Sequence, residues 1–399
     1  MKKKYILSLI LIFFLKLGIS QNIALYNTTA VGDSIIKYKT EMKSVNLNSY
    51  TQDLVNFKTR YATASNHRQV AVYLLNKFKS FGYQNAYLDS FTYSSTWQYN
   101  VIATLQGTTT PDSMYILGAH YDSNSSSNAT VTAPGADDNA SGAAGVLEVA
   151  RAYKAGGFKP KSTIVFVEFA AEDVGLLGSK HYVNDAKTSG LKIAMMVNFD
   201  MISNETSSSN WTMKIEKYTG SEKVTALTKY ITNNYSSLTP LEDLEHITCS
   251  DSYSFNQGGY KAVQLMENTY SPYYHSANDI VSNTNSNYAT EICRVACGML
   301  TYRNTYPLNT SMNDIADNIS FSVYPNPANS YFNFSINHEK AEETMLHIYD
   351  INGSIVLSKN LGIISTLDQK VDLSNISQGF YFVKISTKNK TLIQKLIVR

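Results

Sequence analysis

The chain has 399 residues, a formal net charge of +2 at pH 7 and a charged fraction of 17%. This length accommodates a domain of about 250–300 residues with a sizeable core and a second, smaller domain. The nearly neutral charge excludes the basic surface that is typical of nucleic-acid-binding proteins, so we expect no nucleic acid among the partners.

The N-terminus has the layout of a cleaved secretory signal peptide. A basic start at residues 2–4 precedes an apolar centre over residues 5–15, and the small residues Gly18 and Ser20 follow. An uncleaved membrane anchor is the alternative, but this apolar centre is shorter than the roughly 20 residues that span a bilayer. We expect residues 1–20 to be removed and the mature protein to have no membrane span.

The three cysteines, Cys249, Cys293 and Cys297, allow at most one disulfide bond. Cys293 and Cys297 lie four residues apart in a predicted helix and share one of its faces. Because few other Cys or His residues lie near them, buried thiols are favoured over a zinc site.

Apolar runs alternate with helical patterns between about residues 65 and 305. Residues 65–82 carry apolar side chains at spacings of three and four, which predicts an amphipathic helix. Runs such as "TIVFVEFAA" at 163–171 are apolar on both faces, as parallel strands covered on both sides are. The pattern predicts a three-layer α/β/α domain with a mostly parallel central sheet over residues 21–307.

The pattern changes near residue 308. Residues 308–318 are polar and read as a linker, and residues 319–399 contain short segments in which polar and apolar residues alternate. Such segments predict a small all-β, immunoglobulin-like sandwich.

Charged and imidazole side chains occur at the carboxyl ends of the predicted strands or shortly after them. In chain order they are His120 and Asp122, Asp137 and Asp138, Glu172 and Asp173, Asp200, and His275. Because the carboxyl ends of parallel strands share one edge of a sheet, we expect these segments to meet.

A metal centre accounts for this set better than separate roles do. Each residue alone has an ordinary explanation, such as a core histidine, a helix cap or a turn former. Burying at least four carboxylates together without a cation would be very costly, however. Asp, Glu and His without thiolates suit catalytic zinc, and the number of ligands suffices for two ions that share a carboxylate.

Five segments resemble the signature segments of the secreted bacterial leucyl aminopeptidases, a family of co-catalytic zinc exopeptidases that includes aminopeptidase S. They are "GAHYDS", "PGADDNASG", "FAAEDVGLLGS", "VNFDM" and "YYHSANDI", in the family's order and with similar spacings. The resemblance covers about residues 45–305. It implies a phosphorylase/hydrolase-like fold, two zinc ions and peptide substrates with a free N-terminus, preferably bearing a bulky apolar residue.

The resemblance also implies a role for each residue. His120 and Asp200 would bind one ion and Asp173 and His275 the other, with Asp138 as the bridge. Glu172 would act as general base and acid towards a water that bridges the ions.

Three details accompany this family pattern. A cis peptide bond is implied between Asp138 and Asn139. The family usually has Glu where this chain has Asp173, one methylene shorter. Cys249 matches one half of a family disulfide, but Glu245 stands where its partner is expected.

Further residues have weaker indications. Asp122 suits either a partner for the second nitrogen of His120 or a simple turn. Asp279 is interpreted as a cap. Three residues are candidates for an apolar substrate pocket, although packing in the core is the commoner role: Met201, Phe255 and Tyr274.

The C-terminal segments "FSVYPNPANSYFNFSI", "LHIYDINGSIV", "VDLSNISQGFYFVKI" and "KLIVR" resemble the sorting domain of the type IX secretion system of Gram-negative bacteria. The resemblance implies export through the periplasm to the exterior or the cell surface, with the secretion machinery as partner. A generic immunoglobulin-like accessory or sugar-binding module is the alternative.

Other functions of the first domain remain possible on the same fold. Glutaminyl cyclases use one zinc ion and typically carry extra sequence after the acidic pair, where this chain continues directly as "EDVGLLGS". A carboxypeptidase would need basic residues beside these motifs. A catalytically silent binding protein would have no need of Glu172. We expect a monomeric, secreted zinc aminopeptidase.

Overall fold

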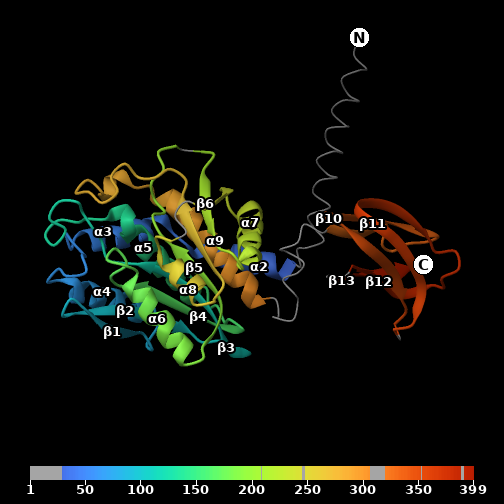
Figure 1. Ribbon diagram of the computed structural model, residues 1–399, viewed down its shortest axis with the longest axis horizontal. Helices are drawn as coiled ribbons and strands as arrows, with labels where there is room; N and C mark the ends of the chain where they lie inside the picture. The colour runs from blue at the N-terminus through green and yellow to red at the C-terminus, as the bar shows by residue number, and fades with distance from the viewer. Residues whose placement is uncertain (1–28, 208, 245–247, 306–319, 352, 388–390) are drawn as a thin grey trace, which may run out of the picture. The chain divides into compact units, whose positions relative to one another are not determined.

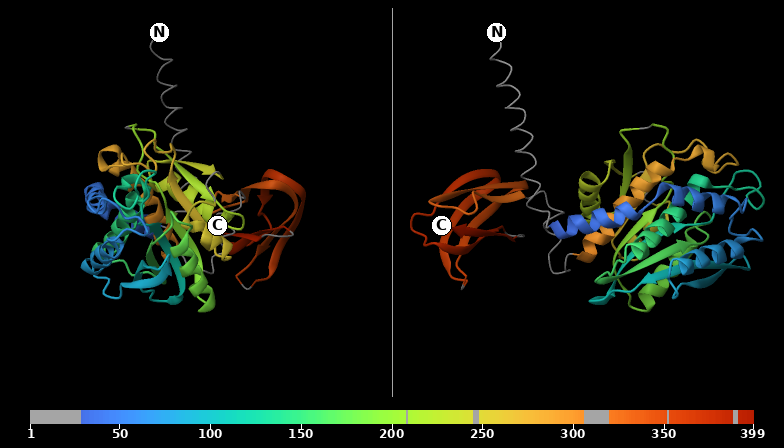
Figure 2. Two further views of the ribbon diagram at one scale, coloured as in Figure 1. Left: turned by 60° about the vertical axis from the view of Figure 1, so that its left-hand side comes forward. Right: turned by 180° about the vertical axis from the view of Figure 1, so that it is seen from behind.

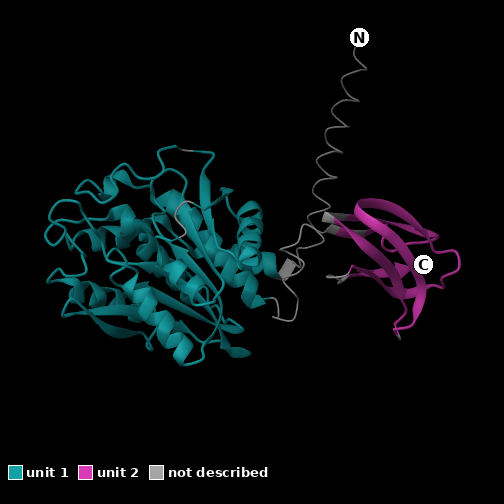
Figure 3. Ribbon diagram, viewed as in Figure 1, with its two compact units in different colours: residues 1–310 teal, residues 311–399 magenta. Residues whose placement is uncertain are grey.

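The computed structural model describes residues 29–207, 209–244, 248–305, 320–351, 353–387 and 391–399. The predicted signal peptide and linker lie outside these residues. The chain divides into two compact units, residues 1–310 and 311–399 (Figure 3). No helix in the described part of the chain is long and apolar enough to cross a membrane.

The first unit is built on one eight-stranded sheet of order β1-β2-β4-β3-β5-β8-β6-β7 (Figure 1). The central strands β4, β3, β5 and β8 pair in parallel, whereas β1, β2 and β6 pair with their inner neighbours in antiparallel fashion. The strands are β1 (Tyr87–Tyr93), β2 (Thr96–Leu105), β3 (Thr110–His120), β4 (Ser162–Phe169), β5 (Lys192–Phe199), β6 (Thr212–Lys217), β7 (Thr239–Asp243) and β8 (Ala262–Glu267).

Helices cover both faces of this sheet. On one face α4, α5 and α7 contact the strands, and α2, α3 and α9 pack against these helices. Helices α6 and α8 cover the other face (Figures 1 and 2). The helices are α2 (Thr29–Glu41), α3 (Ser44–Val55), α4 (His67–Ser80), α5 (Gly142–Ala155), α6 (Leu177–Thr188), α7 (Glu222–Tyr235), α8 (Asp251–Gln257) and α9 (Ser286–Thr305). The predicted three-layer α/β/α architecture is confirmed.

The local patterns explain how these layers pack. All residues of β4 are buried, because helices lie on both of its faces. Helix α4 buries Val70, Leu74 and Phe78 at spacings of four, so the predicted amphipathic helix is confirmed. Small residues allow close helix contacts: a Cβ on Gly298 of α9 would lie 2.6 Å from a methyl carbon of Ile231 on α7.

The cysteines form no disulfide bond. Cys293 and Cys297 are buried thiols on α9, as predicted, and Cys249 is an exposed free thiol. Cys293 faces Gly145 of α5, where an added Cβ would lie 2.7 Å from its sulfur.

The second unit is an all-antiparallel domain with strand order β11-β10-β12-β13, in which β9 also pairs with β10. Its strands are β9 (Ser320–Tyr324), β10 (Tyr331–Tyr349), β11 (Ile355–Asp372), β12 (Gly379–Ser386) and β13 (Thr391–Val398). The predicted all-β class is confirmed, but the prediction of short strands is wrong for β10 and β11, which have 19 and 18 residues. Register shifts interrupt their alternation of polar and apolar residues while the backbone pairing resumes beyond each shift.

Substitution of two neighbouring isoleucines on α2, one buried and one exposed, tests how much the packing of this helix contributes to the free energy of unfolding. Ile35 is fully buried and Ile36 is 50% exposed. We expect Ile35→Ala to lower the free energy of unfolding by about 2–5 kcal/mol, because it leaves a cavity. Ile36→Ala should change it by no more than about 0.5 kcal/mol. Urea unfolding followed by circular dichroism compares the two variants, and equal effects would contradict this packing.

Candidate metal centre

The predicted site residues meet at the carboxyl edge of the central strands. Strand β3 ends at His120, Glu172 follows β4 after a short turn, and Asp200 directly follows β5. Asp138 precedes α5, and His275 lies in the loop after β8. The parallel order of the central strands therefore brings segments together that are far apart in the sequence.

The side chains form two overlapping groups of potential metal ligands. His120, Asp138 and Asp200 offer ligand atoms that all lie within 4.8 Å of one another, and so do Asp138, Asp173 and His275. Within the first group, His120 Nε2 lies 3.3 Å from Asp138 Oδ1 and 3.4 Å from Asp200 Oδ1. Within the second, His275 Nε2 lies 3.1 Å from Asp138 Oδ2 and 2.8 Å from Asp173 Oδ1. Asp138 thus presents one oxygen to each group.

Burial and charge make this cluster unusual. His120, Asp138 and Asp200 are buried, while the side chain of His275 is 26% exposed, so the cluster is open to solvent on that side. Burial lowers the pKa of His275, but hydrogen bonds to Asp138 and Asp173 outweigh it and raise the pKa to about 10. Burial likewise opposes a charged His120, yet Glu172 and Asp200 raise its pKa well above the usual value.

The donor set fits zinc. The imidazoles of His120 and His275 lie within 3.4 Å of the carboxylates of Asp138, Asp173 and Asp200. The buried Oδ2 of Asp173 has no hydrogen-bond partner among the described residues, which is costly unless another group satisfies it. Imidazole and carboxylate ligands around a shared aspartate match the requirements of two neighbouring zinc ions.

Glu172 lies beside both groups and belongs to neither. Its Oε2 is 4.0 Å from His120 Nε2, and it forms a further set of possible ligands with His120 and Asp173. Burial raises the pKa of Glu172 well above the usual value, although His120 opposes this. A carboxylate with a raised pKa is a stronger proton acceptor.

Asp122 organises the turn that carries the two adjacent acids. Its Oδ1 and Oδ2 accept hydrogen bonds from the backbone N–H groups of Glu172 (3.0 Å) and Asp173 (3.2 Å). The same Oδ1 lies 3.5 Å from His120 Nδ1. Asp122 therefore both holds this turn and faces the second nitrogen of His120, so the two predicted alternatives are combined in one side chain.

The backbone around the cluster adopts conformations that side-chain-bearing residues rarely take. Ala171, Met201 and His275 have positive φ values of 58°, 51° and 50°. Each lies in or next to a segment that supplies a candidate ligand, as expected where a fold constrains a functional site. The peptide bond between Asp138 and Asn139 is cis, as the family resemblance implies.

The three pocket candidates occupy different environments. Tyr274 is 40% exposed and stacks on the ring of His275 at a centroid distance of 3.8 Å. Met201 is buried directly after Asp200. Phe255 is buried in the apolar core, where its ring packs against Phe169 and Tyr182, so the structure does not bring it to the cluster.

Two residues contact the ligand-bearing segments in ways that the sequence does not indicate: Asp279, which is interpreted from the sequence as a cap, and Arg60, which no sequence pattern singles out. Asp279 accepts hydrogen bonds from the backbone N–H groups of Asp137 and Asp138, instead of capping its own loop. Its place four residues after His275 was a usable signal. Arg60, whose guanidinium binds the neighbouring backbone, lies in a polar stretch with no distinguishing pattern.

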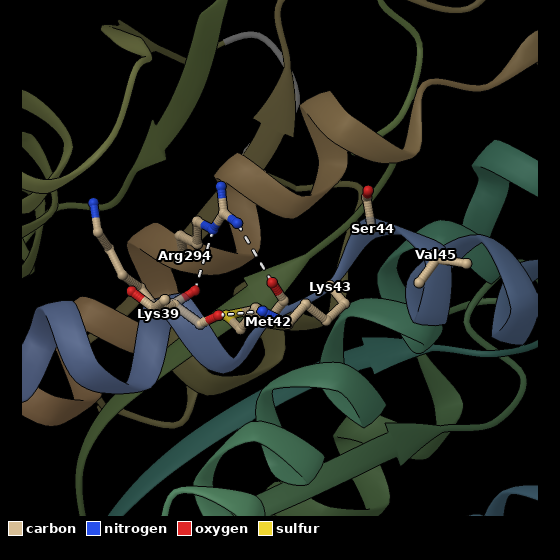
Figure 4. A pocket seen from close by; sticks show the side chains of 7 residues that line it. Lys39, Met42, Lys43, Ser44, Val45 and Arg294 are labelled. Carbon is tan, nitrogen blue, oxygen red and sulfur yellow. Dashed lines mark hydrogen bonds between the residues drawn. The ribbon is translucent and has the colours of Figure 1, made fainter.

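A cavity of about 470 Å³ lies apart from this cluster, at the junction of α2 and α3 (Figure 4). Arg294 of α9 donates hydrogen bonds there to the carbonyls of Lys39 and Met42. None of the residues lining the cavity belongs to the metal cluster: they are Lys39, Thr40, Met42, Lys43, Ser44, Val45 and Arg294.

Comparison with known proteins identifies the family. Residues 100–300 match the model of peptidase family M28. The chain belongs to peptidase family M28. Residues 322–399 match the model of the secretion system C-terminal sorting domain, so the predicted resemblance of both parts is confirmed. As an M28 peptidase, the protein is a zinc-dependent metallopeptidase, which confirms the predicted enzyme class.

Relatives of this chain are named as peptidases. A probable leucine aminopeptidase of Arthroderma otae is 30% identical over 261 residues, which cover 62% of this chain and 69% of that protein. A probable zinc metalloprotease of Pyrenophora tritici-repentis is 45% identical over 106 residues, but these span only 26% of this chain and 24% of that protein.

Two solved structures share the M28 fold. The LapA aminopeptidase of Legionella pneumophila aligns with a TM-score of 0.63 at 20% identity, over 69% of this chain and 75% of that one. A glutaminyl cyclase of Bacteroides thetaiotaomicron aligns with a TM-score of 0.54 at 17% identity, over 66% of this chain and 98% of that one.

Zinc titration of aspartate variants tests the overlap of the two groups. We expect Asp138→Asn to weaken the binding of both ions, because Asp138 belongs to both groups, and Asp200→Asn to weaken only one. Zinc should stabilise the wild-type protein by about 4 kcal/mol when free zinc is 1,000-fold above Kd. Zinc content and thermal unfolding measure both effects.

The control for these variants is Asp112→Asn, which changes an exposed aspartate near the start of β3, at the opposite end of that strand from His120. It should bind zinc as the wild type does. Equal zinc loss in the Asp138 and Asp200 variants would contradict a shared carboxylate.

Proposed function

We propose that this protein is a di-zinc aminopeptidase that removes the N-terminal residue from peptides. The observation that carries the proposal is the position of Asp138, whose two oxygens face two separate sets of ligands. Such an arrangement supports two neighbouring ions better than one. The relatives named as aminopeptidases support the same reaction class.

The proposed roles follow from the two groups. His120 and Asp200 would hold one zinc ion and Asp173 and His275 the other, while Asp138 belongs to both groups and would be shared by them. The carboxylate of Asp173 is shorter than the Glu usual in the resembling family, and its contact with His275 supports a role as ligand nonetheless.

Glu172 is the proposed proton carrier. Zinc, when bound, supplies Lewis acidity that polarises a substrate carbonyl and makes water more acidic. Glu172 lies beside the ligands, is buried and has a raised pKa, so it is suited to take a proton from water and return it to the leaving amine. Asp122 keeps it in place through the hydrogen bond from the Glu172 backbone.

The substrate is proposed to bind through its free α-amine and its N-terminal side chain. A protonated α-amine is attracted to the carboxylates of the cluster. Tyr270 and Tyr274 are each 40% exposed and pack edge to face at a centroid distance of 5.0 Å. This aromatic pair, stacked on His275 through Tyr274, supports a preference for bulky apolar N-terminal residues.

The protein is proposed to be exported before it acts. The sorting domain supports secretion by a type IX system, and the predicted signal peptide supports passage through the periplasm. The mature enzyme is proposed to be a monomer that acts outside the cell or at its surface.

A Glu172→Gln variant tests the mechanism. It keeps the size of the side chain but loses the proton acceptor, so we expect kcat for leucine p-nitroanilide to fall by about 10²–10⁴-fold while zinc content is unchanged. The matched control is Glu222→Gln at the start of α7, which should have wild-type activity.

Substrate panels separate the proposal from its alternatives. The wild-type protein should release p-nitroaniline from substrates with a free amine and leave N-acetylated ones intact, and a chelator should abolish activity. Cyclisation of N-terminal glutamine without hydrolysis would instead indicate a glutaminyl cyclase. Inactivity towards every free-amine substrate would refute the aminopeptidase function and favour a silent binding protein.

Removal of residues 319–399 tests the export proposal. In a host with a type IX system, the full chain should appear outside the cell, whereas the truncated chain should remain in the periplasm. Peptidase activity of the truncated protein should persist, because the metal cluster lies entirely within the first unit. Immunoblots of cell fractions measure the location, and external truncated protein would contradict sorting by this domain.

A further inference from the structure

Arg60 is a fully buried cation that forms no ion pair with any described carboxylate. Its guanidinium instead donates hydrogen bonds to backbone carbonyls. Nε binds the carbonyl of Tyr121 (2.7 Å), Nη1 that of Pro134 (2.6 Å) and Nη2 that of Gly135 (2.8 Å); Nη1 also reaches Leu54 at 3.4 Å. Burying a guanidinium in this way is costly, so a compensating interaction is required.

These carbonyls belong to two segments that supply candidate ligands. Tyr121 directly follows His120, and Pro134 and Gly135 lie just before Asp138. The backbone N–H of Arg60 extends the link by donating to the hydroxyl of Ser123, 3.0 Å away. Arg60 therefore ties the end of β3 to the loop that enters α5.

Asp279 holds the same loop through the N–H groups of the loop, whereas Arg60 holds it through the carbonyl groups. Its Oδ1 and Oδ2 accept hydrogen bonds from the backbone N–H groups of Asp137 (2.8 Å) and Asp138 (3.0 Å), and its carbonyl accepts one from Ala136 (3.0 Å). Because Asp279 lies four residues after His275, it connects the loop to a third ligand-bearing segment. Residues 134–138 thus direct carbonyl groups towards the guanidinium of Arg60 and N–H groups towards the carboxylate of Asp279.

Gly135 shows how closely this arrangement is packed. Its φ of +50° lies in the left-handed region, which disfavours side chains. A Cβ at this position would lie 2.3 Å from the carbonyl oxygen of Asp138 and 2.9 Å from Nη2 of Arg60. Any side chain at position 135 would push the loop away from the guanidinium.

The charge of Arg60 also matters to the cluster. Burial lowers the pKa of Arg60 to about 10, while Asp279, Asp122, Asp138 and Asp173 act in the opposite sense. The guanidinium therefore stays charged at neutral pH and reduces the repulsion between these carboxylates. In return, they stabilise the buried cation.

We propose that Arg60 and Asp279 are positioning residues that clamp residues 134–138 and so fix the carboxylate of Asp138 between the two groups of zinc ligands. This inference rests on the proposed di-zinc function. Neither residue touches substrate or zinc. They act by setting the position of Asp138 and, for Arg60, by offsetting negative charge.

The test uses the zinc-loaded full chain titrated with a chromophoric chelator. Arg60→Lys keeps the charge but loses the planar fork of donors, and Asp279→Asn keeps the size but loses one acceptor. Gly135→Ala displaces the loop itself. We expect each variant to release zinc about 10–100-fold more readily than the wild type does.

The matched control is Arg151→Lys. Arg151 also binds a backbone carbonyl, that of Glu41, and an acid, Glu148, but it lies away from the cluster. This variant should lose thermal stability without releasing zinc more readily. Saturating zinc should restore most of the kcat of Asp279→Asn, whereas it should not restore that of Glu172→Gln, because only the former acts through metal position.

Two results would overturn the clamp. One is wild-type zinc retention in both Arg60→Lys and Asp279→Asn. The other is zinc loss that merely follows thermal stability, as judged against Arg151→Lys. If Arg60→Lys does not fold, the zinc retention of Asp279→Asn alone tests the clamp. A wild-type chain that holds no zinc would refute the di-zinc function together with this inference, so the two failures are distinguishable.

Discussion

The repulsion between buried carboxylates at one edge of the sheet is the constraint on which the rest of this structure depends. Asp138, Glu172, Asp173 and Asp200 lie close together with little access to water. Such a cluster is stable only when positive charge is placed among its members. Three kinds of group can supply this positive charge. They are the imidazoles of His120 and His275, the guanidinium of Arg60 and the proposed zinc ions.

The parallel sheet makes so dense a cluster possible. The carboxyl ends of strands β3, β4, β5 and β8 lie at a common edge of the sheet. The helices on both faces of the sheet shield these strands from water. The long loops after these strands are held by hydrogen bonds from side chains to backbone groups, such as those of Asp122 and Asp279. The strands and the hydrogen-bonded loops together limit how far each carboxylate can move away from the others.

The sequence allowed the three-layer fold and the identity of the clustered residues to be predicted, because both depend on local pattern. Apolar runs mark buried strands, and a charged residue after such a run, like Asp200 after β5, stands out. The residues that hold the ligand-bearing loops in place, such as Arg60, could not be predicted in this way. The carbonyls of Tyr121, Pro134 and Gly135 that Arg60 binds lie 61 to 75 residues further along the chain, and nothing in the sequence around Arg60 indicates them. For Phe255 the sequence favours core packing but does not exclude a place in the substrate pocket, and the structure places it in the core.

The wide spacing of the clustered residues along the chain has a consequence for how a metal enters. Apart from the adjacent pair Glu172 and Asp173, no two of these residues are sequence neighbours. The unfolded polypeptide therefore offers a metal ion at most two neighbouring ligands, and the full set forms only when β3, β4 and β5 have come together. Metal loading then reports that the carboxyl edge of the sheet has formed.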